Sequence, residues 1–326
     1  MFARLKTAPL FRSPLALFSV IYLSFALTLT FYHAQTIERK FWQARKEFHE
    51  GIVGGQFYAP YQYRVGAIWL AEAGGWIAEK TLGLAPGKTA YLAREALYIL
   101  ERLFATWFLF IVFHLYLESW FTSERAFSGT LILAGLHTYT YYSYYFQPDS
   151  VINILLLALG ALWIVRGATT RLYPLMLVAS FVRETSGLLI AIFLAQHWRT
   201  RKGFLHAFGL FAVWVAVQLI LRGMFGNRLF FPARPFSMQI ENLGWPLFLF
   251  AIFWVVPILR FKTLPPFLAR LLVLMTPPLI VANFWFGKVE ETRLFLDLAI
   301  VLIPATLIGL FGAQKSTAPE KTTTSP

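Results

Sequence analysis

The chain has 326 residues, of which 58% are hydrophobic and only 14% are charged. Long apolar runs recur along it with no soluble-domain stretch between them, which predicts an all-α, polytopic integral membrane protein and excludes a β-barrel. The net charge of +13 comes from Lys and Arg residues spread among short loops, as membrane orientation requires, and this pattern argues against nucleic acid binding. Because the chain has no cysteine, disulfides, thiol chemistry and Cys-ligated metals are excluded.

The first apolar run covers 14–32 and follows a basic segment. No small-residue cleavage site comes after it, so we expect an uncleaved first span with a cytoplasmic N-terminus. The next strong run begins only near Tyr98, which leaves 33–97 as a long outer loop. Apolar residues recur at helical spacing among charged residues in this loop, and we therefore expect interfacial helices there.

The later apolar runs complete a predicted set of about eight full transmembrane helices. We assign a single transmembrane domain to 1–313 and a disordered cytoplasmic tail to 314–326, because the tail is poor in hydrophobic residues. The predicted spans after the first loop are 98–120, 127–146, 151–165, 204–221, 245–259, 267–286 and 294–311.

The apolar run 172–197 carries a charged triplet, Arg183-Glu184-Thr185, near its middle. An ionisable pair in hydrocarbon is costly and indicates function. The run is long enough for one crossing but too short for two. Basic residues flank it on both sides, which favours two cytoplasmic ends and a re-entrant or broken helical hairpin; a single span remains the alternative.

With this topology, nearly all of the 16 acidic residues lie on the outer face. Asp149 and Asp297 are the only aspartates. Asp149 lies in a tight outer turn, where it could cap the next helix or act as a catalytic base. Arg183 and Glu184 could neutralise each other as a structural pair or take part in function.

More charged residues surround the entry to the last span. Glu290 and Glu291 precede Arg293, and Arg293 has the i,i+4 spacing to Asp297 that suits an ion pair on a helix face. Arginine offers a rigid fork of donors for phosphate, and an outer carboxylate can take a proton from a hydroxyl group. These residue types suit the transfer of a group from a lipid-linked phosphate.

The predicted layout resembles C-type (GT-C-like) membrane glycosyltransferases. It consists of one N-terminal span, a long outer loop with interfacial helices, and an acid in the turn after the third span. Short stretches add to the resemblance to bacterial members of that group. They are APYQYRV at 59–65, QPDS at 147–150, RET at 183–185 and ETRLF at 291–295.

The resemblance implies transfer of a sugar from a polyprenyl-phosphate donor to an envelope acceptor on the outer face of a bacterial inner membrane, with both termini cytoplasmic. The implied partners are the lipid-linked sugar and membrane lipids. The resemblance implies no definite cofactor. A requirement for a divalent cation stays open, and so do the identities of the sugar and the acceptor and the oligomeric state.

In that family a catalytic acid, usually aspartate, follows the first span. This chain has Glu38 at the matching place, with Glu47 and Glu50 as rivals, and Asp149 at the family's second acid position. We take Glu38, Asp149 and Glu184 as the catalytic candidates. The candidates for binding substrate or phosphate are Arg64, Arg183, Arg293, Glu290, Glu291, Tyr61 and Tyr145.

Two other functions fit the same charges. A non-enzymatic carrier or flippase for a lipid-linked sugar would use them to line a translocation path. A membrane scaffold of an envelope-assembly complex would use them only to hold its own helices together.

Overall fold

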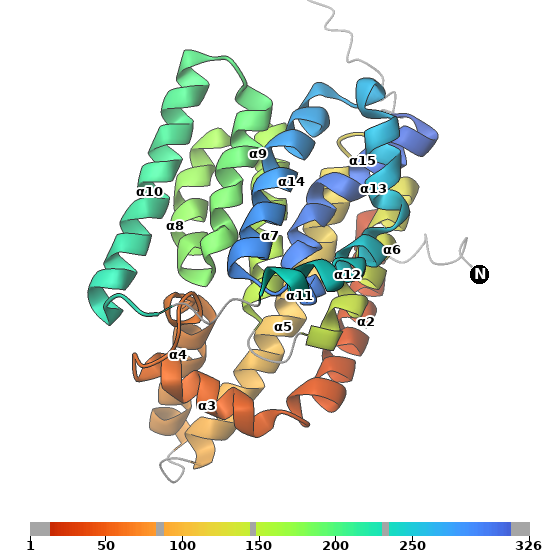
Figure 1. The fold of residues 1–326 in the computed structure, drawn as a ribbon. Helices are drawn as coiled ribbons and strands as arrows, with labels where there is room; N and C mark the ends of the chain where they lie inside the picture. The colour runs from red at the N-terminus through yellow and green to blue at the C-terminus, as the bar shows by residue number, and fades with distance from the viewer. Residues whose placement is uncertain (1–13, 83–87, 144–147, 230–234, 314–326) are drawn as a thin grey trace, which may run out of the picture.

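The computed structural model describes residues 14–82, 88–143, 148–229 and 235–313. These residues form helices joined by turns and contain no strand, which confirms the predicted all-helical class. Figure 1 shows most helices packed side by side, with α3 (Trp42–Val53) and α4 (Gly66–Leu82) gathered at one end of the bundle. We call this the α3–α4 end, and the other the opposite end. The predicted tail, 314–326, lies outside the described residues.

Five helical segments are long and apolar enough to cross a membrane, so the chain is a helical membrane protein. Two of them, at the start of the chain and in α5 (Lys88–Leu117), flank the long first loop as predicted. The last one comprises η8 (Thr292–Leu298) and α15 (Ala299–Phe311) and is largely buried inside the bundle. The five segments are Pro14–Glu38, Tyr91–Leu117, Arg201–Phe225, Pro266–Phe286 and Thr292–Phe311.

Two other predicted spans form shorter helices. The helices α6 (Ser123–Tyr139) and α7 (Asp149–Val165) have 17 residues each. At 1.5 Å per residue each is about 25 Å long, slightly less than the ~30 Å of a typical hydrocarbon core. The prediction of about eight full spans therefore exceeds the five long segments.

The predicted span 245–259 is part of a bent pair of helices. The first arm, Phe236–Phe250, contains α11 and α12, and the second, Ile252–Leu259, is α13. The two arms meet at 76° around Ala251, whose φ is 37°. Counted as one broken span, this pair raises the number of candidate spans to six.

The charged triplet separates two short helices, α8 (Leu172–Val182) and α9 (Leu188–His197). Arg183 has an extended backbone that ends α8. At the start of α8, Tyr173 Oη lies 3.0 Å from His206 Nδ1 of α10 (Arg201–Phe225).

The far end of α8 and the break lie beside a later part of α10, where Gln218 donates to Ser180 O and Trp214 donates to Glu184 O. On α9 the Phe193 ring again contacts His206. Both helices thus share the same stretch of α10.

The first loop covers one end of this bundle. The short helix η3 (Tyr61–Tyr63) lies between α3 and α4. Its Tyr63 hydroxyl donates to Gly226 O at 2.9 Å, and Ala59 N donates to Leu229 O at 2.9 Å. The loop is therefore tied to the segment that follows α10, and this contact places Arg64, the next residue after η3, against the bundle.

The packing of the broken pair can be tested at Gly160 of α7. A Cβ atom there would lie 2.3 Å from Leu189 of α9 and 3.3 Å from Leu175 of α8. We expect Gly160→Val to lower the free energy of unfolding by about 1–3 kcal/mol through overpacking, measured as a lower thermal midpoint in detergent. Gly135→Val on α6 is the control, because nothing lies within 4 Å of its Cβ position. Equal midpoints for the two variants would contradict this packing.

Candidate functional site

Arg64 is the centre of a charged group at the α3–α4 end. Its Nε donates to Glu184 Oε2 at 2.9 Å, and its Nη2 makes a further short contact with Glu184 Oε1. Its Nη1 lies 3.4 Å from Asp149 Oδ2. The side chain is only 7% exposed. Arg64 therefore joins two carboxylates that are distant in the sequence, one at the start of α7 and one in the break between α8 and α9.

Burial alone would lower the pKa of the Arg64 guanidinium, since it removes water from the charged form. The negative charges of Glu184 and Asp149 act in the other direction and raise the pKa above its usual value. Arg64 consequently stays protonated. The Tyr61 ring lies 4.8 Å from the guanidinium carbon and covers another side of the cation.

Arg183 meets the same group from the broken helix. It is 1% exposed, and its Nη1 donates to Ser150 Oγ at 2.7 Å, next to Asp149. Its Nε is buried and has no hydrogen bond partner among the described residues. The sequence left open whether Arg183 and Glu184 pair with each other; in the structure their side chains face different partners, Ser150 and Arg64.

Arg293 adds a third guanidinium from the start of the last span. Its Nε and Nη2 donate to Glu291 Oε2 at 3.2 and 2.7 Å. Electrostatic interactions connect Arg293 with Asp149 and Tyr61. Arg293 is 7% exposed.

The i,i+4 ion pair that the spacing of Arg293 and Asp297 allowed does not form; Arg293 pairs with Glu291 and Asp297 with Asn153. Arg293 and Asp297 both lie in η8, which is a 3₁₀-helix. With three residues per turn, positions four apart do not share a face.

Asp297 is paired instead with Asn153 of α7. Asn153 Nδ2 lies 3.2 Å from both carboxylate oxygens of Asp297 and 3.1 Å from Thr185 Oγ1. Sequence reasoning missed Asn153, although an amide inside the apolar run 151–165 was a visible signal. This contact connects α7, the broken helix and the last span beneath the charged group.

We call the six charged side chains the Arg64 network. It contains three guanidinium groups and three carboxylates, and the buried carboxylate of Asp297 lies next to it and interacts electrostatically with Arg183. The members are Arg64, Asp149, Arg183, Glu184, Glu291 and Arg293. The structure thus brings together most of the predicted substrate-binding residues, with Tyr61 beside them and Glu290, half-buried, next to Glu291. Tyr145 lies outside the described residues.

Glu38 belongs to a different cluster. Its carboxylate contacts His33 Nδ1 at 3.2 Å, Arg45 Nη1 at 3.1 Å and Arg102 Nη2 at 3.2 Å. It is 5% exposed. In the described part of the chain no hydrogen bond or ion pair links Glu38 to Arg64. Three positively charged or titratable partners therefore surround Glu38, the residue that the resemblance matched to the catalytic acid after the first span.

The rival acids in the first loop, Glu47 and Glu50, lie on the exposed surface of α3. Within the described ranges, no three or more His, Asp or Glu side chains are grouped so that they could hold a metal ion. The charged side chains of the site are arginine and carboxylate groups.

Comparison with protein families, with curated proteins and with solved structures gives no significant match for this chain. The class that fold and geometry define is a helical membrane protein with a buried arginine–carboxylate network.

The Arg64 network predicts a large effect on stability. Arg64→Met leaves Glu184 and Asp149 buried without their cation, and we expect it to lower the free energy of unfolding by about 3–5 kcal/mol. The measurement is the thermal midpoint of the purified protein in detergent. Arg228→Met is the control, because Arg228 is exposed and lies close to Tyr63 at the same end.

A double variant separates a lost charge pair from a general packing defect. Arg64→Met combined with Glu184→Met removes both partners, and apolar replacement of a whole buried pair is often neutral. We expect the double variant to be more stable than Arg64→Met alone. A double variant less stable than Arg64→Met would show that this ion pair does not carry the effect.

Proposed function

We propose that this chain is a C-type membrane glycosyltransferase, which transfers a sugar from a polyprenyl-phosphate donor to an acceptor in the cell envelope. The observation that supports this best is the convergence of Arg64, Arg183 and Arg293 around Asp149. A sugar phosphodiester donor needs guanidinium groups for its phosphate and a base for the acceptor hydroxyl.

Among the candidate bases, Asp149 is the one held most weakly. Its contact with Arg64 is 3.4 Å, longer than a normal hydrogen bond to a guanidinium, whereas Glu184 receives two donors of the same side chain. Glu38 is enclosed by its own cluster. We therefore assign the base to Asp149 and a positioning role to Glu184, which orients Arg64.

In the proposed reaction, the acceptor oxygen attacks the anomeric carbon with inversion and the bond from that carbon to the phosphate oxygen breaks. Asp149 receives the hydroxyl proton. The polyprenyl phosphate leaves with the negative charge, which Arg64 and Arg293 stabilise. Arg183, with one donor unused among the described residues, is a third phosphate ligand.

The proposal places the α3–α4 end on the outer face of a bacterial inner membrane. In it, α8 and α9 form a re-entrant hairpin whose apex carries Arg183 and Glu184, and about eight segments cross the membrane. The shared contact of Tyr173 and Phe193 with His206 supports such a hairpin, because one straight helix would carry those two residues about 30 Å apart.

Activity is tested with the protein reconstituted in vesicles containing synthetic polyprenyl-phosphate hexoses or pentoses, by measuring release of polyprenyl phosphate. Loss of a general base typically costs ~10²–10⁴-fold, and we expect a loss of this size in kcat for Asp149→Asn, with donor binding retained. Glu47→Gln, an exposed change in the first loop, is the control and should leave kcat unchanged. We expect Glu38→Gln to lower stability more than turnover per folded molecule.

Other outcomes would favour the alternative functions. Movement of the labelled lipid across the vesicle membrane without a new glycosidic product would indicate a carrier. A protein with neither activity, and tolerant of Asp149→Asn and Arg183→Lys in cells, would indicate a scaffold.

Single introduced cysteines test the topology, because the chain has none of its own. Thr170 and Thr200 flank the α8–α9 pair and are exposed, and Gln43 is exposed on α3. We expect an impermeant maleimide to label Gln43→Cys in intact cells and Thr170→Cys and Thr200→Cys only after permeabilisation. Labelling of Thr170→Cys and Thr200→Cys from opposite sides would show that 172–197 crosses once.

A further inference from the structure

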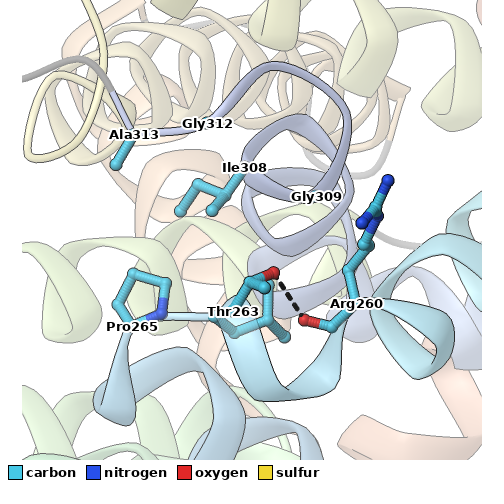
Figure 2. A pocket seen from close by; sticks show the side chains of 8 residues that line it. Arg260, Thr263, Pro265, Ile308, Gly309, Gly312 and Ala313 are labelled. Carbon is cyan, nitrogen blue, oxygen red and sulfur yellow. Dashed lines mark hydrogen bonds between the residues drawn. The ribbon is translucent and has the colours of Figure 1, made fainter.

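A hollow of about 460 Å³ lies at the opposite end of the bundle, far along the helices from the Arg64 network. It is lined by the connection between α13 and α14 (Pro266–Phe286) and by the end of α15. Figure 2 shows Arg260 at one edge of the hollow and Pro265 at the other, with Ile308 and Gly312 above them.

Local contacts hold the backbone around the hollow. The Thr263 hydroxyl donates to Arg260 O at 2.8 Å. Gly309 permits the close approach of α15 to α13, since a Cβ atom there would lie 2.7 Å from Val256 and 3.2 Å from Arg260 Cβ. The hollow is therefore a consequence of how two helix ends pack.

The connection that lines the hollow is basic. Arg260 and Lys262 are exposed, and Arg125, which follows the exposed Glu124, lies over the ring of Phe311 at the end of α15. No acidic residue occurs between Glu241 and Glu290 of the sequence. The C-terminal ends of α13 and α15 contribute about half a negative charge each, which the full charges of these basic residues outweigh.

The hollow is formed where two candidate membrane segments, Pro266–Phe286 and Thr292–Phe311, and the second arm of the bent pair, Ile252–Leu259, end or begin. We therefore expect it at the depth of lipid headgroups. Ile258 and Leu259 beside it are 66% and 76% exposed, so an acyl chain has apolar helix surface to lie against. A second hollow of about 300 Å³, lined mainly by apolar side chains, uses the same connection.

We infer that this hollow binds the headgroup of an anionic phospholipid, with the Arg260 guanidinium contacting the phosphate and the acyl chains lying along α13. The chemistry is charge pairing at the membrane surface together with apolar burial. This site is independent of the proposed glycosyl transfer.

The test is native mass spectrometry of the delipidated full chain, titrated with phosphatidylglycerol or with phosphatidylcholine of the same acyl chains. We expect one phosphatidylglycerol to bind about tenfold more tightly than phosphatidylcholine, as expected for one charge-assisted contact. Arg260→Gln should remove most of this preference. Lys262→Gln, in the same exposed connection but outside the lining, is the matched control and should change it less than about twofold.

Each contrary result overturns the inference. Equal affinity for the two lipids, or an unchanged preference in Arg260→Gln, would exclude a headgroup site at Arg260. An equal loss in Lys262→Gln would show diffuse surface attraction. Displacement of the lipid by equimolar glycerol 3-phosphate would show a site for soluble phosphate esters. The thermal midpoint of Arg260→Gln should match that of the parent chain, because the side chain is exposed.

Discussion

A guanidinium group withdrawn from water requires negative charge close by, and this constraint on Arg64 determines how three distant parts of the chain meet. Burial opposes its charge, and Glu184 and Asp149 restore it. Glu184 comes from the break between α8 and α9, and Asp149 comes from the first turn of α7. If any of these segments moved, a charged group would remain unpaired inside the bundle, at a cost of several kcal/mol.

The Glu38 cluster and the Arg64 network differ in what they leave accessible. Around Glu38, His33, Arg45 and Arg102 leave little of the carboxylate for another molecule. This cluster connects the end of α2 (Pro14–His33) with α3 and α5, so it holds the first loop to the bundle. In the Arg64 network, Asp149 keeps a long contact to one donor, which is compatible with a reacting group.

The sequence predicted a re-entrant or broken helical hairpin at 172–197, because an ionisable pair in an apolar run is a local signal, and the structure has a break there between α8 and α9. The catalytic role of Asp149, suggested by an acid after proline, stays a prediction. The sequence could not predict that Arg64, from the first loop, would be the partner of Glu184, since their contact spans 120 positions. Neither did it reveal the contact between Asn153 and Asp297 or the 3₁₀ geometry of η8, which depends on packing against other helices. The bend at Ala251 likewise has no local signal.

The three guanidinium groups of the network face at least as many carboxylates, because Asp297 also interacts with Arg183, and this bears on the proposed chemistry. A phosphate that enters this buried network adds negative charge that guanidinium groups already close to carboxylates neutralise only in part, unless one carboxylate moves away or takes up a proton. Asp149 is the carboxylate with the longest contact, so it is displaced most easily when phosphate approaches Arg64. In the proposed reaction, uptake of the acceptor proton by Asp149 removes one negative charge while the leaving phosphate is still bound. In that reaction the charge of the network would couple phosphate binding to the activation of the base.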